Sequence, residues 1–182
     1  LEANPDDINP KIVQEWANVG INRLSMGIQS FHDNELQFMK RAQSSKEAKQ
    51  AITDSIDNGI KNISIDLIYG VPGSSIESWK QNLKIATSFK VTHISSYCLT
   101  VEEKTLLNHW VNKNQVKLVE DELSLQQFEI LIKHLNEYNF EHYEISNFSL
   151  DGFRSKHNTS YWEGKEYIGI GPSAHSFYHK ER

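Results

Sequence analysis

The stretch that decides the fold is Asn62-Ile63-Ser64-Ile65-Asp66-Leu67-Ile68-Tyr69-Gly70-Val71-Pro72-Gly73. Its β-branched run predicts a strand that is buried on both faces, as in a parallel sheet. Gly70, Pro72 and Gly73 predict the turn that ends this strand. Asp66 is therefore a charge embedded in apolar sequence near the carboxyl end of a strand, which is where α/β folds bind ligands.

Helix and strand patterns alternate on both sides of this stretch. In order, the sequence predicts a helix entered near Pro5 and ending at Gly20, a strand over residues 22–30, a helix over residues 44–58, the Asp66 strand, a helix from Ser75, and a strand over residues 93–100. Such an order is typical of βα units around a parallel sheet. We expect an α/β fold, with a partial (β/α) barrel as the leading interpretation and an open doubly wound sheet as the alternative.

The pattern changes after Thr100. Residues 101–115 look like an irregular polar connection, and residues 120–139 carry the apolar stripe of a long amphipathic helix. Strands are expected over residues 143–148 and 167–176. We therefore divide the chain into a partial barrel, residues 1–115, and a helix with an aromatic-rich strand extension, residues 116–182.

Composition narrows the function classes. Acidic residues outnumber basic ones by 24 to 19, which argues against nucleic-acid binding. No apolar run approaches the roughly 20 residues that span a bilayer. The single cysteine, Cys98, excludes an intramolecular disulfide framework and favours a reducing, cytoplasmic location. We expect it to be a small buried residue. The abrupt start at Leu1, without Met, is interpreted as that of an internal piece of a longer protein.

Polar side chains recur at the carboxyl ends of the predicted strands. They are Glu2, Gln29, Asp66 and Thr100, and Arg41 follows the strand of Gln29. In a barrel these ends converge on one mouth. Arginine can bind a carboxylate with two hydrogen bonds, and carboxylates accept from hydroxyls or an ammonium group, so the set suits a zwitterionic ligand that carries a ribose. Each residue alone is explained as well or better by a structural role, and only their joint position favours a site.

Other motifs are weaker evidence for a binding site. The glycines of Gly70-x-x-Gly73 and Gly169-x-Gly171 are explained about as well by turns, and neither pattern matches a Walker A or dinucleotide fingerprint. His157 and His175 have no second metal-ligating motif nearby. We expect both to be hydrogen-bonded structural histidines.

Seven segments, taken in order, carry a resemblance to a known family. They are Glu2-Ala3-Asn4-Pro5, the run from Gly20 through Arg23, Met26 and Gln29 to Phe31, Ile65 to Gly73, His93 to Thr100, Tyr143-Glu144-Ile145-Ser146-Asn147-Phe148, His157-Asn158-x-x-Tyr161-Trp162, and Gly169 to Ser176. The chain resembles the oxygen-independent coproporphyrinogen III oxidase family of radical SAM proteins, and within it the HemW-like, haem-chaperone branch. The resemblance covers nearly the whole chain.

The resemblance implies a fold, cofactors and a site. Proteins of this family use a [4Fe–4S] cluster to cleave S-adenosylmethionine to a 5′-deoxyadenosyl radical, and the oxidase decarboxylates substrate propionates with it. The implied fold is a partial (β/α) barrel of six units, followed by further strands and a C-terminal domain. The S-adenosylmethionine contacts of the family fall on Glu2, Gln29, Arg41, Asp66 and, by strand-end position, Thr100.

One departure limits what the chain can do by itself. The family's C-x-x-x-C-x-x-C cluster motif is absent, and Cys98 cannot replace it. We therefore predict that this polypeptide binds neither cluster nor cofactor tightly and catalyses nothing alone. A barrel lacking its first strands would also expose a sheet edge, which favours self-association.

Two functions compete for the whole protein: oxidative decarboxylation of coproporphyrinogen III, and delivery of haem by a chaperone without oxidase activity. The Tyr143–Phe148 and His157–Trp162 motifs favour the chaperone. An unrelated βα-barrel enzyme that uses Asp66 is the third alternative, and the seven ordered motifs argue against it.

Overall fold

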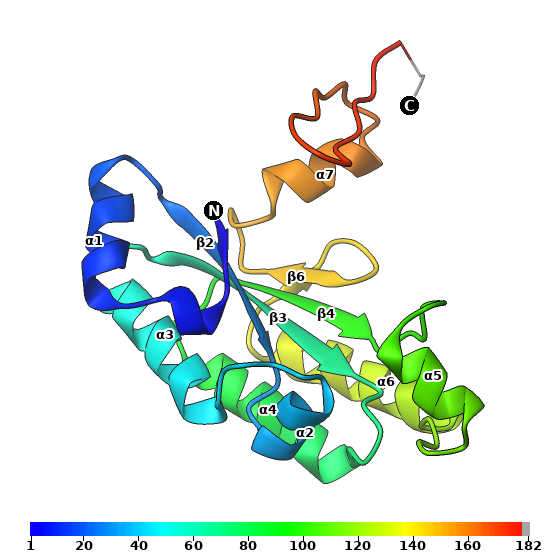
Figure 1. Ribbon diagram of the computed structural model, residues 1–182. Coiled ribbons are helices and arrows are strands. Elements are labelled where there is room, and N and C mark those ends of the chain that lie inside the picture. Colours follow the sequence, from blue (N-terminus) through cyan, green and yellow to red (C-terminus); the bar gives the residue numbers. More distant parts are fainter. Residues whose placement is uncertain (180–182) are drawn as a thin grey trace.

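A single six-stranded sheet forms the centre of the computed structural model, which describes residues 1–179 (Figure 1). The strand order is β1-β2-β3-β4-β6-β5; β1 to β4 are parallel and β6 is antiparallel to β4 and β5. Their bounds are β1 Glu2–Ala3, β2 Arg23–Gln29, β3 Asn62–Tyr69, β4 His93–Cys98, β5 Glu141–His142 and β6 Asn147–Ser149. The expected α/β architecture with a parallel core is confirmed.

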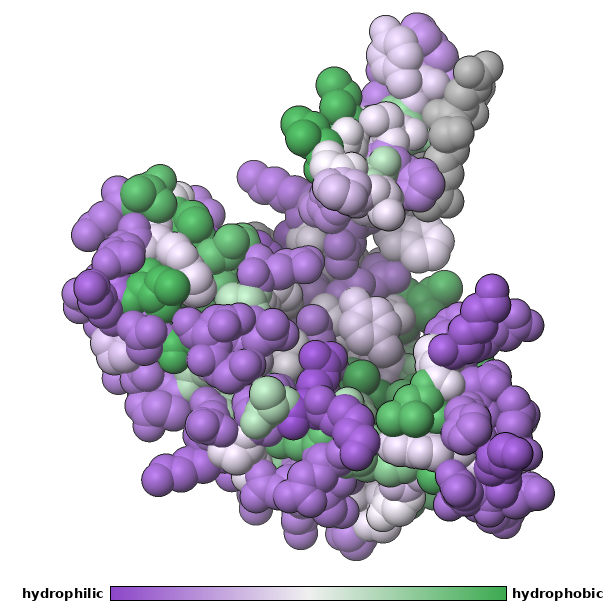
Figure 2. Space-filling view, in the orientation of Figure 1, coloured by the Kyte–Doolittle hydropathy of each residue, from purple (hydrophilic) through white to green (hydrophobic). Residues whose placement is uncertain are grey.

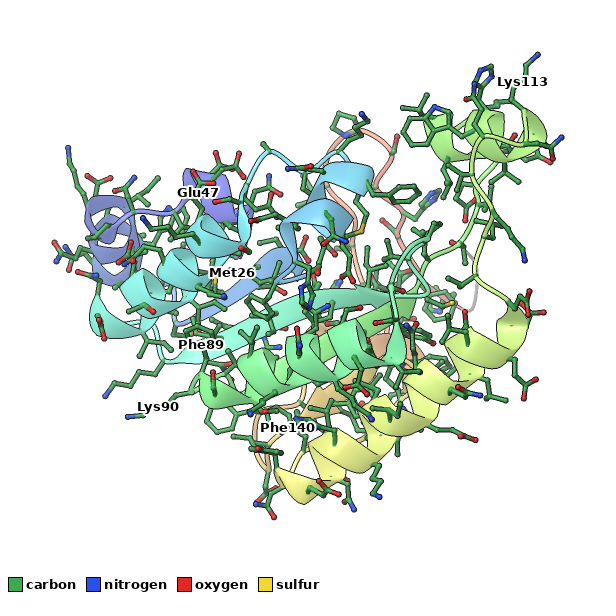
Figure 3. The ribbon with its side chains drawn as sticks, turned by 90° about the horizontal axis from the view of Figure 1, so that it is seen from below. Met26, Glu47, Phe89, Lys90, Lys113 and Phe140 are labelled. Atoms are coloured by element: carbon green, nitrogen blue, oxygen red, sulfur yellow. The ribbon has the colours of Figure 1, made fainter. Side chains whose placement is uncertain are left out.

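Helices cover one face of this sheet. Figures 1 and 3 show α3, α4 and α6 lying side by side beneath the strands, while the opposite face carries no helix of comparable length. A doubly wound sheet would need helices on both faces, so the arrangement favours a section of a barrel. The helices are a short 3-10 turn Pro5–Asp7, α1 Pro10–Asn18, α2 Asp33–Phe38, α3 Ser45–Asp57, α4 Ile76–Ser88, α5 Leu106–Asn112, α6 Asp121–Glu137 and α7 Lys156–Trp162. Among the described residues, no helix is long and apolar enough to cross a membrane.

The helix-covered face is built from apolar residues in register. Met26 pairs with Ile65, Ile65 with Ile94, and Ile94 with Phe148, and all four are buried. Met26, labelled in Figure 3, begins this row. Because successive residues of a strand point to opposite faces, the neighbouring rows must point to the open side.

The open face carries polar residues instead. One cross-strand row joins Glu2, Ser25, Ser64, His93 and Ser149 over five strands. The expected burial of β3 on both faces therefore holds only in part: Ser64 is buried, whereas Asp66 and Ile68, further along the same face, are partly exposed. The fold thus presents a polar sheet surface around Asp66.

Local signals explain where the main helices begin and how α6 is held. Ser44 and Glu47 form a capping box before α3, as Ser75 and Ser78 do before α4. On α6, the buried Gln127 accepts a hydrogen bond from the backbone N–H of Gly70 (2.8 Å). The indole of Trp79 donates to the backbone oxygen of Gln127 (2.7 Å). The first bond attaches α6 to the turn that ends β3, and the second attaches it to α4.

Several sequence expectations are wrong in detail. The connection over residues 101–115 contains α5, and α2 was not expected, because helices of six or seven residues are too short for a periodic pattern. Residues 143–148 contain a turn before β6, and residues 167–176 form no strand beyond an isolated bridge from Tyr167 to Phe177. Cys98, the last residue of β4, is exposed and not buried as expected.

The division of the chain at residue 115 stays a prediction. β5 and β6 follow that point in the sequence, yet they extend the same sheet through the pairing of β6 with β4. Beyond them, α7 and the residues that follow project away from the sheet (Figure 1). Figure 2 shows the same segment standing clear of the body of the protein.

Candidate functional site

Four of the five predicted site residues line one cavity. Glu2 on β1, Gln29 at the end of β2, Asp66 on β3 and Arg41 between α2 and α3 surround a space of about 360 Å³. Thr100 does not line it: β4 ends two residues earlier, and Thr100 is exposed. The strand-end argument therefore brings four residues together and leaves out the fifth.

An irregularity in β2 aims Gln29 at this cavity. The register of β2 against β3 shifts between Met26 and Gln29, and Gln29 has a φ of 67°, in the left-handed region. Such bulges re-aim side chains near functional sites. Gly27 provides the space: a Cβ at this position would lie 2.7 Å from Nε2 of Gln29. Gly27 is therefore a sequence feature that could have indicated the position of the Gln29 side chain, but no motif included it for that reason.

The charged form of Asp66 is destabilised by its surroundings. Burial and, to a lesser extent, the nearby charge of Glu2 raise its pKa from the usual 3.8 to about 6, although a hydrogen bond from Ser95 and the charges of Arg41 and Arg23 act the other way. Among the described residues, no basic nitrogen lies within 4 Å of either carboxylate. A ligand that brings a cation or hydroxyl groups would relieve this repulsion.

Arg41 provides a positive charge in the cavity, opposite in sign to Glu2 and Asp66. Its guanidinium makes no hydrogen bond or ion pair with the described residues, so its donors are available to an anion. A planar guanidinium matches a carboxylate in two parallel hydrogen bonds. Two carboxylates on one side and one guanidinium on the other fit a zwitterion, and the amide of Gln29 adds a neutral donor and acceptor.

A larger cavity of about 750 Å³ adjoins the first and shares Glu2, Ser25 and Asp66 with it. It runs along the open face toward the amino ends of β2 to β4 and is closed by residues 152–158. Besides the buried His93, its basic residues are Arg23, Arg154, Lys156 and His157. A ligand in this cavity would lie beside a ligand in the smaller one.

His93 joins the sheet to the wall of the larger cavity. Its buried ring lies 2.7 Å from the Ser64 hydroxyl through Nδ1 and 2.7 Å from the Tyr143 hydroxyl through Nε2. Burial, together with the charge of Arg23, lowers the pKa of His93 to about 3. The Tyr143 hydroxyl also accepts from the backbone N–H of Ser155 (3.3 Å). In the sequence His93 and Tyr143 lie in separate motifs, and no pattern predicts that they are in contact.

The other two candidate histidines behave differently from expectation. His157 and His175 are both exposed, and neither ring makes a hydrogen bond to the described residues. The ring of His157 packs edge-on against Tyr161, with centroids 4.7 Å apart. The prediction of hydrogen-bonded structural histidines is therefore not confirmed for either.

Comparison with known proteins identifies the family of this chain. The model of the radical SAM superfamily matches residues 1–86, a span that contains all four cavity residues. A Bacillus subtilis (strain 168) protein named "Heme chaperone HemW" is 34% identical over 177 residues, which cover 97% of this chain and 47% of that protein. Residues 1–86 of this chain form a radical SAM domain. A Haemophilus influenzae protein of the same name is 35% identical over 175 residues, 96% of this chain and 45% of that protein. The chain thus spans about half the length of the curated relatives it matches.

A solved radical SAM structure confirms the fold. Coproporphyrinogen III oxidase (HemN) from Escherichia coli matches with a TM-score of 0.77 at 21% identity, over 96% of this chain and 43% of the oxidase. The predicted partial barrel of the radical SAM type, followed by a long helix and further strands, is therefore confirmed.

The residues of this chain do not fit the cluster that radical SAM chemistry needs. A [4Fe–4S] cluster is held by several cysteine thiolates, whereas this chain has only Cys98. Cys98 lines neither cavity. Within residues 1–179, no group of three or more His, Cys, Asp or Glu side chains could hold a metal ion. That the chain alone binds no cluster stays a prediction.

Proposed function

We propose that this chain provides the S-adenosylmethionine site of a radical SAM protein of tetrapyrrole metabolism. The observation that carries the proposal is the cavity in which Glu2, Asp66, Gln29 and Arg41 meet, with its carboxylates and its guanidinium unpaired. S-Adenosylmethionine has a carboxylate, an ammonium group, a sulfonium centre and ribose hydroxyls. The cavity offers a guanidinium to the carboxylate, and carboxylates to the ammonium group and the ribose hydroxyls.

Each residue has a distinct role in this proposal. Arg41 donates to the carboxylate of the methionyl group, and Glu2 and Asp66 accept from the ammonium group and the ribose hydroxyls. Gln29 offers its amide to the remaining polar atoms. Thr100, which the family resemblance also implies, is exposed outside the cavity and has no assigned role. S-Adenosylmethionine supplies radical chemistry only beside a reduced iron–sulfur cluster, whose cysteine motif this chain lacks.

We expect Arg41→Ala to weaken S-adenosylmethionine binding by about tenfold or more, because a charge-assisted bidentate contact is lost. Isothermal titration of this chain at high ligand concentration would measure the effect, because without the cluster we expect saturable but weak binding. The matched control is Lys46→Ala, which removes an exposed cation from α3. 5′-Methylthioadenosine, which lacks the amino-acid part, should bind Arg41→Ala and the wild type equally. An equal loss for both ligands, or no saturable binding by the wild type, would refute the assignment.

The larger cavity is the proposed place of a tetrapyrrole in the whole protein. Arg23, Lys156 and His157 can face the carboxylates of such a ligand, whereas the guanidinium of Arg154 is already paired with Glu141. The shared wall at Glu2 and Asp66 would bring the ligand next to S-adenosylmethionine. The ligand is coproporphyrinogen III in the oxidase and haem in the chaperone. The same proposal includes a cytoplasmic location, which the single cysteine favours, and self-association through β1 at the edge of the sheet.

Between these two activities we favour the haem chaperone, because relatives with 34% and 35% identity carry that name. The likeness to the oxidase, at 21% identity, supports the fold alone. For the whole protein, reconstituted anaerobically with its cluster, we expect saturable haem binding and no vinyl product from coproporphyrinogen III. Spectroscopic titration with haem and chromatography of the tetrapyrroles measure these outcomes. Formation of the vinyl product at a catalytic rate would establish the oxidase instead.

A further inference from the structure

Two of the four cavity residues lie on neighbouring segments that must be held in place. Gln29 comes from the bulge of β2, and Arg41 from the connection between α2 and α3. Neither segment is a regular element at the point where its side chain enters the cavity. Their relative position therefore depends on contacts between the connection and the bulge.

Gln43 makes those contacts. Its side chain is only 4% exposed, and its Nε2 donates to the backbone oxygens of Gly27 (3.2 Å) and Ile28 (3.5 Å). Both acceptors lie inside the bulge, directly before Gln29. Gln43 itself lies two residues after Arg41. One buried amide thus joins the segment that carries Arg41 to the segment that carries Gln29.

Within the part of the chain that the structure describes, the other hydrogen bonds in and beside this connection are not made to β2. The N–H of Arg41 donates to the backbone oxygen of Leu36 (3.0 Å), and the N–H of Ser45 donates to Oδ1 of Asp33 (2.7 Å). Both acceptors belong to α2. Among the described residues, only the side chain of Gln43 bonds this connection to β2.

The bulge itself requires support. Gln29 holds a positive φ, which is unfavourable for a residue with a side chain. Its amide lies over Gly27, the residue whose carbonyl Gln43 holds. The Ile28 carbonyl also accepts from the backbone N–H of Ser30 (2.8 Å), so the Gly27 carbonyl depends more on Gln43. Without the amide of Gln43, the Gly27 carbonyl would lose a buried donor and the bulge could relax toward a regular strand.

We propose that Gln43 is a positioning residue of the S-adenosylmethionine cavity. It attaches the Arg41 connection to the β2 bulge and so sets Gln29 and Arg41 at the separation at which both contact one ligand. The proposal rests on the proposed function of the cavity. It differs from a purely structural role for Gln43, which would affect stability without affecting Gln29 and Arg41 together.

The test uses two substitutions and a matched control. Gln43→Met keeps the length and packing of the side chain and removes both hydrogen bonds, and Gln43→Asn keeps the amide but shortens its reach by one methylene. Gln37→Met makes the first of these changes at an exposed position on α2. We expect both Gln43 variants to bind S-adenosylmethionine about three- to tenfold more weakly, while Gln37→Met binds as the wild type does.

A double-mutant cycle separates positioning from stability. In the Arg41→Ala background, Gln43→Met should weaken binding far less than it does in the wild type, because the residue it positions is already gone. Equal losses in both backgrounds would overturn the proposal. Unchanged affinity in Gln43→Met, with a normal urea midpoint, would overturn it as well.

A second readout needs no ligand. The side-chain amide signals of Gln29 in a nitrogen–proton NMR spectrum, assigned with Gln29→Ala, should move toward those of a solvent-exposed glutamine in Gln43→Met. If they move and the wild type binds no S-adenosylmethionine, the proposed function fails and the positioning stands. If the wild type binds and neither the signals nor the affinity change, the positioning fails and the proposed function stands.

Discussion

Asp66→Asn is expected to make the protein more stable at neutral pH and to impair S-adenosylmethionine binding. Burial, with the charge of Glu2, raises the pKa of Asp66 from 3.8 to about 6. The carboxylate that dominates at pH 7 is therefore disfavoured in the folded state by roughly 3 kcal/mol relative to the unfolded chain. Asparagine has nearly the same shape and no charge, so the free energy of unfolding should rise by up to about 3 kcal/mol.

The same substitution removes the feature that suits Asp66 to a ligand. A carboxylate accepts charge-assisted hydrogen bonds from an ammonium or hydroxyl group, and losing one such bond weakens binding by about 10- to 100-fold. Wild-type affinity should itself fall as the pH drops below about 6, where Asp66 becomes protonated. A gain in stability with a loss of binding is the signature of a residue retained for function.

Urea denaturation followed by circular dichroism would measure the stability, and isothermal titration the affinity. Asp57→Asn, at the exposed end of α3, makes the same chemical change away from both cavities and should alter neither quantity by much. Lower stability of Asp66→Asn would contradict the argument, since it would mean that the carboxylate is stabilised by its neighbours.

The sequence was sufficient to predict four residues of the smaller cavity. It was not sufficient to predict residues whose role depends on tertiary contacts. Glu2, Gln29 and Asp66 follow from β/α wiring, which places strand ends together without knowledge of any side-chain contact. The same rule predicted Thr100 as a site residue. The prediction failed because β4 ends at Cys98, so Thr100 does not lie at a strand end.

The residues that were missed depend on tertiary contacts. Gln43 acts on backbone carbonyls of β2, which no residue pattern reveals. His93 and Tyr143 are 50 residues apart in the chain and meet only because β6 folds back along β4. Motif reading located both segments of that pair, yet only the antiparallel pairing brings the two rings together.

The second large effect is expected at His93, which should make the folded state sensitive to acid. The ring is neutral when buried between Ser64 and Tyr143, and its pKa falls from 6.5 to about 3 because of burial and the charge of Arg23. Above pH 6.5 neither state binds the proton. Below it the unfolded chain binds the proton and the folded protein does not, so stability falls as the pH falls toward 3.

His93→Gln should remove the contribution of this residue to acid sensitivity. Between pH 6.5 and 4.5 the histidine contributes a loss of about 2 kcal/mol, whereas glutamine can hydrogen-bond to both hydroxyls and does not titrate in this range. Urea midpoints measured at several pH values would show the difference. The exposed His109, on α5, provides the control His109→Gln, which should leave the slope unchanged.

Asp66 and His93 act in opposite directions over the same pH range. As the pH falls from 6.5 to 4.5 the folded state binds a proton at Asp66 before the unfolded chain does, which adds about 2 kcal/mol of stability, close to the loss that His93 contributes. The two contributions nearly cancel in the wild type. Asp66→Asn should therefore make the protein more labile in acid than the wild type, His93→Gln should make it more resistant, and the double variant should return to the slope of the wild type. Slopes of the same sign in the two single variants would show that one of these two groups is not held in the protonation state that its burial imposes.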